Sequence, residues 1–113
     1  MRAWQIISSG GIDALRLTDV EMPTPAQGQV RVKIEASSLN YRDLLIIEDP
    51  IGRNLHLPRV PNSDASGTIT AVGSGVKSLR EGDRVASCFF SSWVDGVITH
   101  AAMSSALGGA LDG

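Results

Sequence analysis

The sequence contains very few residues that form disulfides or bind transition metals. Cys88 is the single cysteine among 113 residues, which excludes an intramolecular disulfide and a zinc site built from several cysteines. The only two histidines, His56 and His100, have no spacing that connects them to a metal or a nucleophile, so we expect both on the surface or in loops. Because Cys88 lies in an apolar stretch, we expect its thiol to be buried and unreactive.

Long apolar runs and blocks of one charge are also lacking. No apolar stretch approaches the roughly 18 residues of a membrane helix, and the N-terminus lacks the pattern of a signal peptide. Lysine and arginine are scattered and the net charge is only −2, which argues against a nucleic-acid or membrane partner. Together with the lone cysteine, these absences predict a cytoplasmic protein.

The chain is long enough for one domain with its own hydrophobic core. Its 12 glycines and 5 prolines recur at short intervals, which favours short strands joined by turns. The clearest strand is 30–36, where apolar and charged residues alternate. One short helix or a pair of tight turns is expected at 40–48, and a mobile tail at 104–113. The other expected strands are 2–7, 14–21, 67–72 and 84–90. This pattern predicts a mostly β, barrel-like domain, which would equally suit a binding module.

Three segments go beyond generic β patterning. The first, from Pro23, reads PTPAQGQVRVK, and the second, from Ala36, reads ASSLNYRDL. The third joins PNSDASGTI, which starts at Pro61, to AVGSGVKSLREGDRV, which ends at Val85. In this order and spacing, they resemble the N-terminal GroES-like domain of the medium-chain dehydrogenase/reductase superfamily. The resemblance is greatest to its zinc-free, quinone-oxidoreductase-like branch and extends over about residues 1–100.

The resemblance implies a fold and a reaction. Residues 1–113 would form a GroES-like, alcohol dehydrogenase-like N-terminal domain, a partly open β barrel with one short helix, truncated at its C-terminus. In the complete enzyme a Rossmann domain would bind NADP or NAD and a small-molecule substrate would be reduced. The loop from Gly73 to Gly75 lacks the third glycine of a dinucleotide fingerprint and precedes a turn and a strand. We therefore expect no Rossmann domain, no bound cofactor and no activity in this chain alone.

The resemblance also bears on zinc. Zinc-dependent members have a cysteine ligand at the position of Asn40 and a histidine ligand at the position of Ser63. An asparagine amide and a serine hydroxyl are poor substitutes for a thiolate and an imidazole. We therefore expect no metal.

Without zinc, other groups must polarise the substrate oxygen. The resemblance puts the Asn40 turn beside the nicotinamide, so Asn40 and Arg42 are the candidate catalytic residues and Tyr41 the candidate cofactor contact. Asp43 and Asp64 are expected to support the substrate side. Arg42 stands where alcohol dehydrogenases often have a serine or threonine proton relay, but a guanidinium stays protonated. Reduction of a carbonyl, enone or quinone is therefore favoured over alcohol oxidation.

Each candidate also has a plainer structural role. Asn40 is equally suited to cap a helix, Tyr41 to pack at the rim of the core, and Asp64 to shape a turn. Asp43 suits structural support better than catalysis. A second hypothesis for the whole chain is a stand-alone binding or self-association module, with a homodimer formed through exposed strand edges. A co-chaperonin shares the fold type, but the motifs at 40–43 and 82–85 favour the reductase.

Overall fold

Five strands and two short helices follow the boundaries that glycine and proline mark in the sequence. The computed structural model describes all of residues 1–113. The elements, in chain order, are β1 (Arg2–Ile6), a 3-10 turn η1 (Gly11–Ala14), β2 (Leu15–Asp19), β3 (Val30–Ser38), α1 (Tyr41–Glu48), β4 (Asp64–Val72), β5 (Arg84–Ala86) and α2 (His100–Met103). Neither helix is long and apolar enough to cross a membrane.

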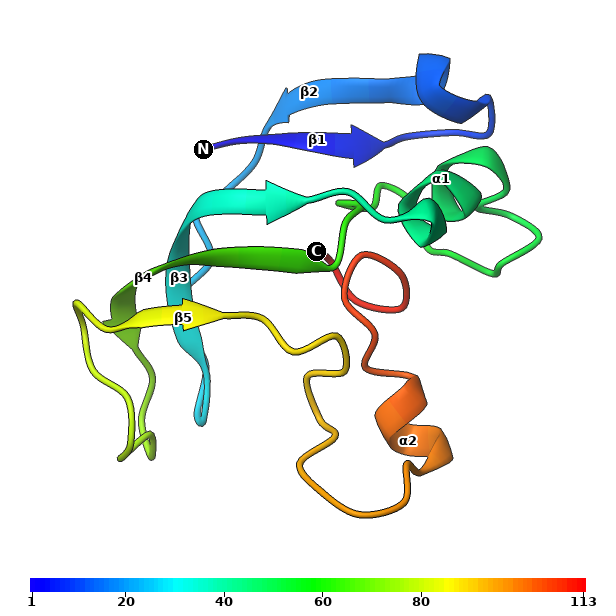
Figure 1. Cartoon of the computed structure of the whole chain (residues 1–113). Helices are drawn as coiled ribbons and strands as arrows, with labels where there is room; N and C mark the ends of the chain where they lie inside the picture. The colour runs from blue at the N-terminus through cyan, green and yellow to red at the C-terminus, as the bar shows by residue number, and fades with distance from the viewer.

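The strands form two antiparallel sheets that do not close into a barrel (Figure 1). One sheet is the β1–β2 hairpin, and the other has the order β3–β4–β5. Ile6 exchanges two backbone hydrogen bonds with Arg59, of 2.8 and 3.0 Å, which anchor the hairpin to the loop before β4. The prediction of a mostly β, partly open fold with one main helix is confirmed.

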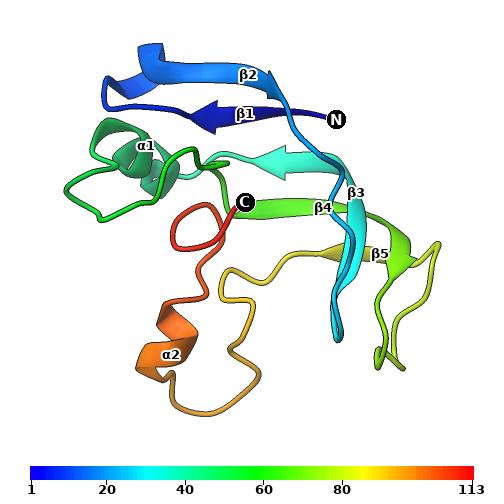
Figure 2. The same cartoon turned by 180° about the vertical axis from the view of Figure 1, so that it is seen from behind.

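β3 is strongly bent (Figure 2). Its pairing with β4 shifts register near Val32 and again between Ile34 and Ala36, and such bulges bend a strand. A Cβ atom at Gly67 would collide with the backbone oxygen of Lys33, so glycine is needed for the close approach of the two strands. Alternation predicted the strand correctly, but its apolar face is not covered throughout, since Ile34 is 55% exposed.

The hydrophobic core lies between the hairpin and α1. Ile6 is fully buried and packs with Ile46 and Ile47 of the helix, and three leucines surround them: Leu15, Leu55 and Leu57. Helix α1 ends before Pro50, which cannot continue a helix because it has no N–H to donate. Only 14 of 113 residues are buried, so the core is small and much apolar surface stays open.

The last third of the chain differs most from expectation. β5 ends at Ala86 and not near Phe90, and the chain leaves the sheet there. Cys88 is consequently exposed, so the prediction of a buried thiol is wrong. The histidines are both exposed, as predicted. Residues 104–113, the expected tail, follow α2 in a series of turns, and their end returns to the start of β4 (Figure 1).

Two hydrogen bonds and one ion pair hold the last two residues against the loop before β4. The Gly113 N–H donates to the Val60 carbonyl (3.0 Å), and the Val60 N–H donates to the Asp112 carboxylate (2.8 Å). Arg59 forms an ion pair with Asp112 at 3.1 Å. The end of the tail therefore packs on the loop that leads into β4.

Candidate functional site

The turn at Asn40 connects the end of β3 to α1. Asn40 has an extended backbone (φ −115°, ψ 154°) and Tyr41 is the first helical residue. The Asn40 N–H donates to Asp43 Oδ2 (2.8 Å), and the Asp43 N–H donates to the Asn40 carbonyl (3.0 Å). Asn40 and Asp43 form a capping box, in which each side chain faces the backbone N–H of the other residue, so Asn40 also caps α1. Asp43 therefore fixes the turn.

Asp43 is almost completely buried. Only 4% of the residue is exposed, and its Oδ1 atom has no hydrogen-bond partner. Its place in the first turn of α1 is favourable for a negative charge, because the helix dipole is positive at that end. Since so little of Asp43 is accessible, it influences the site through the Asn40 turn.

The Asn40 side chain points to the start of β4. Its Nδ2 donates to Asp64 Oδ2 at 2.6 Å. An ionised carboxylate can only accept, so this bond fixes which end of the amide faces Asp64. The second Nδ2 hydrogen of Asn40 remains free, and the residue is exposed.

Asp64 is itself held by its neighbours in sequence. Its backbone N–H donates to Asn62 Oδ1 (3.0 Å), and the Ser63 hydroxyl donates to its Oδ1 (3.4 Å). Ser63 is 2% exposed, and its carbonyl accepts from the Ser87 hydroxyl (2.9 Å). The structure thus joins the turn before α1 to the strand start at β4 through a polar network.

Tyr41 lies beside Asn40 on the open surface. It is 75% exposed, and the preceding Leu39 is 87% exposed. The alternative in which Tyr41 packs at the rim of the core is not observed. An accessible phenol beside an oriented amide is a surface that a ligand can contact.

Arg42 contacts segments that are distant in sequence. Its Nη1 donates to the Leu107 carbonyl (3.0 Å), and its guanidinium lies over the Phe89 ring, 4.6 Å from the centroid. Partial burial lowers the pKa of Arg42, while the neighbouring Asp43 carboxylate opposes this shift. The group stays charged at working pH. These contacts attach the segments around residues 89 and 107 to α1.

The network includes a residue that sequence reasoning missed. Asn62 accepts from Asp64 and also donates from Nδ2 to the Ser37 hydroxyl (2.7 Å). Its φ of +83° is unusual for a residue with a side chain, although asparagine tolerates it better than most. The only signal in the sequence was an asparagine after Pro61 at the end of a loop, which is typical of many turns.

The donor set at this turn does not fit a zinc ion. Residues 1–113 contain no group of three or more histidine, cysteine, aspartate or glutamate side chains placed to hold a metal. At the turn itself, the Asn40 amide and the Ser63 hydroxyl both donate to the Asp64 carboxylate. One carboxylate with two neutral donors lacks the nitrogen and sulfur ligands that zinc prefers.

Comparison with known proteins identifies the family. Residues 26–111 match the alcohol dehydrogenase GroES-like domain. The chain is 44% identical over 104 residues to a zinc-type alcohol dehydrogenase-like protein of Schizosaccharomyces pombe, covering 91% of this chain and 30% of that protein. It is 38% identical over 106 residues to the quinone oxidoreductase of Rattus norvegicus, covering 93% and 31%. The chain therefore belongs to the alcohol dehydrogenase GroES-like domain family of the medium-chain dehydrogenase/reductase superfamily, and it spans about a third of these relatives' length.

Solved structures agree with this assignment. A putative alcohol dehydrogenase from Sinorhizobium meliloti superposes with a TM-score of 0.86 at 37% identity, over 99% of this chain and 33% of that one. The Escherichia coli quinone oxidoreductase complexed with NADPH superposes with a TM-score of 0.70 at 28% identity, over 76% and 26%. The homologues are thus oxidoreductases of the alcohol dehydrogenase and quinone oxidoreductase type.

Proposed function

We propose that residues 1–113 form the substrate-side domain of a zinc-independent, NAD(P)H-dependent oxidoreductase that reduces a carbonyl, enone or quinone. The observation that carries this proposal is the exposed Asn40 amide, oriented by Asp64 at 2.6 Å. In zinc-dependent members, the family resemblance puts a cysteine ligand at this position. Relatives that include quinone oxidoreductases, one of them solved with NADPH, support the same reaction class.

Asn40 would act on the oxygen of the substrate. A bound nicotinamide supplies the hydride, and the oxygen of the reduced group gains negative charge as the hydride arrives. A donor that is already oriented stabilises this charge without reorganisation. The Nδ2 hydrogen of Asn40 that is not bonded to Asp64 is available for this role, and the exposed Tyr41 is available to contact the cofactor.

Arg42 has a different part in this proposal. Its Nη1 is already bonded to the Leu107 carbonyl, and the guanidinium is stacked on Phe89. We therefore assign Arg42 to hold these segments against α1, which would shape the wall of the site. A guanidinium that stays protonated is also unsuited to relay a proton, so the proton that completes the reduction would come from solvent at the exposed Asn40 turn.

The dinucleotide itself would be bound outside these residues. All strand pairs here are antiparallel, whereas a dinucleotide-binding fold is built on parallel strands. We infer that residues 1–113 contribute the substrate side and the Asn40 contact, and that turnover requires a cofactor-binding partner domain.

A chimera tests the proposed function. Residues 1–113 replace the matching segment of the Rattus norvegicus quinone oxidoreductase, and the loss of NADPH absorbance is followed with 1,4-benzoquinone as the acceptor. We expect quinone-dependent oxidation of NADPH that a zinc chelator does not change. A folded chimera that binds NADPH without oxidising it would contradict the proposal, as would activity that a chelator abolishes and zinc restores.

The open sheet favours a second candidate, self-association. A hollow of about 470 Å³ lies over the β3–β5 sheet and is lined mainly by apolar side chains, among them Val32, Ile34 and Leu79. β3 and β5 are also edge strands, which can pair with another chain. A second copy of this chain covering the hollow would form a homodimer. Sedimentation equilibrium would show a dimer that Ile34→Lys weakens, and a monomer at every concentration would exclude it.

A further inference from the structure

We propose that Asn62 is a positioning residue for the Asn40 amide and acts through Asp64. This inference rests on the proposed function, because the orientation of Asn40 matters only if its amide meets a substrate. Asn62 belongs to the loop before β4 and not to the turn that carries Asn40. Its role follows from the hydrogen bonds that it makes, from its backbone conformation and from the segment packed against it.

Asn62 and Ser37 together hold the backbone of Asp64. Asn62 Oδ1 accepts from the Asp64 N–H (3.0 Å), and Asn62 Nδ2 donates to the Ser37 hydroxyl (2.7 Å). The same hydroxyl donates to the Asp64 carbonyl (3.1 Å). Both polar groups of the Asp64 backbone are thus engaged on one side by a single amide and hydroxyl pair. This arrangement fixes the point from which the Asp64 carboxylate reaches Asn40.

The conformation of Asn62 is also constrained by the C-terminal segment. At φ +83° a residue with a side chain is in a sparsely populated region, and such a conformation persists when its surroundings enforce it. Gly108 is buried against this residue, and a Cβ atom at Gly108 would collide with the backbone of Asn62. The returning C-terminal segment therefore packs directly on the backbone that presents the Asn62 side chain.

Asn40 depends on this support for the direction of its amide. With Asp64 held in place, the amide turns its NH₂ end to the carboxylate and keeps one hydrogen free. If Asp64 loses its backbone restraints, the amide of Asn40 samples both flips. One flip directs the amide oxygen at the position of a developing oxyanion, which it would repel. Asn62 thereby sets the fraction of molecules in which Asn40 acts as a donor.

The test uses the 113-residue chain and the nitrogen-15 NMR signals of its asparagine side chains. Asn62→Gly keeps the left-handed backbone at no steric cost but removes the side chain. Asn54→Gly is the matched control, because Asn54 is the other residue with a side chain at positive φ (54°) and its side chain makes no hydrogen bond. Asn40→Ala identifies the Asn40 signal pair.

We expect Asn62→Gly to speed the exchange of the Asn40 NH₂ protons with water about tenfold, because the charge-assisted hydrogen bond from Asn40 to the less restrained Asp64 weakens. The backbone signals of α1 should stay in place. Asn54→Gly should change neither the Asn40 exchange rate nor these backbone signals. If Asn62 only shaped its turn, Asn62→Gly would leave the exchange rate of the Asn40 NH₂ protons unchanged, and that result would overturn the proposal.

Ser37→Ala gives a second reading in case Asn62→Gly does not fold. It removes the hydroxyl that both Asn62 and the Asp64 carbonyl use, on a residue that is exposed in β3. Faster exchange of the Asn40 pair supports the proposal, and unchanged exchange overturns it. A chimera without turnover would contradict the proposed function and leave these signals unaffected, so the two failures are distinguishable.

Discussion

At the residue scale, two carboxylates in different surroundings determine where Asn40 lies. Asp43 is buried and accepts the backbone N–H of Asn40, whereas Asp64 is partly exposed and accepts its side chain. The first fixes the turn and the second fixes the amide. A change at Asp43 should therefore affect stability, and a change at Asp64 should affect mainly the site.

Asp43→Ala should lower the free energy of unfolding by about 1–2 kcal/mol, because the Asn40 N–H at the start of α1 loses its acceptor. Urea unfolding followed by circular dichroism measures the change. Asp95→Ala is the control, since Asp95 is exposed and its side chain makes no hydrogen bond, and its effect should stay within about 0.5 kcal/mol. Equal urea midpoints for Asp43→Ala and Asp95→Ala would show that the Asp43 cap contributes nothing to stability.

At the element scale, local sequence patterns predicted the positions of the strands better than they predicted what surrounds each strand. The alternation from Val30 to Ala36 identified β3, and Pro50 correctly predicted the end of α1. The bulges in β3 and the exposure of Ile34 depend on pairing with β4 and on what covers the sheet, which no local pattern encodes.

The candidate site was likewise predicted from the sequence only in part. The motif around Asn40 was recognisable in sequence, and the structure brings Asn40, Asp43 and Asp64 together. Asn62 was missed because its role arises from contacts with Ser37 and with Gly108, which lie 25 residues before it and 46 residues after it. The packed tail was missed for the same reason, since its partners are distant in the chain.

The returning C-terminal segment gives a prediction about Gly108. Gly108→Ala should destabilise the fold more than Gly96→Ala, although both glycines have a positive φ, of +65° and +68°. An added Cβ meets the Asn62 backbone at Gly108 but open space at Gly96. The left-handed conformation alone costs about 1–2 kcal/mol in either variant. The unfolding free energies of Gly108→Ala and Gly96→Ala should differ from each other by more than this backbone cost. Equal values would argue against a close contact between Gly108 and Asn62.

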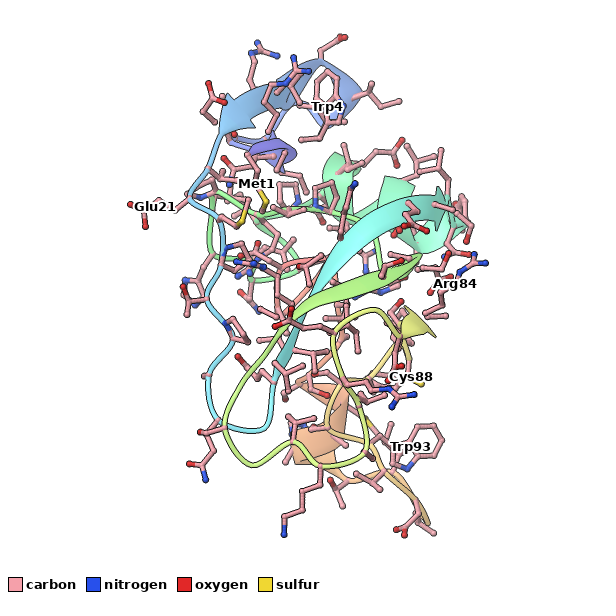
Figure 3. The ribbon with its side chains drawn as sticks, turned by 90° about the vertical axis from the view of Figure 1, so that its left-hand side faces the viewer. Met1, Trp4, Glu21, Arg84, Cys88 and Trp93 are labelled. Carbon is pink, nitrogen blue, oxygen red and sulfur yellow. The ribbon has the colours of Figure 1, made fainter.

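At the scale of the whole molecule, the open sheets leave surface for other parts of an enzyme. Trp4 in β1 and Trp93 after β5 lie at opposite ends of the molecule (Figure 3). The Asn40 turn is exposed, and none of the strand pairs is parallel. Such a domain can line a substrate site while a separate fold holds the dinucleotide.

Titration of the isolated chain with NADPH tests this division of labour. The two tryptophans report on both ends of the molecule, and we expect no saturable change in their fluorescence at micromolar NADPH. The physical reason is that the proposed nicotinamide contact is limited to the Asn40 and Tyr41 surface, and the loop from Gly73 to Gly75 lacks the third glycine of a dinucleotide fingerprint. Saturable binding with a submicromolar dissociation constant would contradict the proposed division.

The central claim is that the Asn40 amide replaces a metal as the group that stabilises the substrate oxygen. The most direct test is the turnover number of the chimera with and without Asn40→Ala, measured with saturating NADPH and quinone. Loss of one oriented donor should lower kcat roughly 100- to 1,000-fold while NADPH binding and the fold persist. An Asn40→Ala chimera that reduces the quinone as fast as the unchanged chimera would contradict the account.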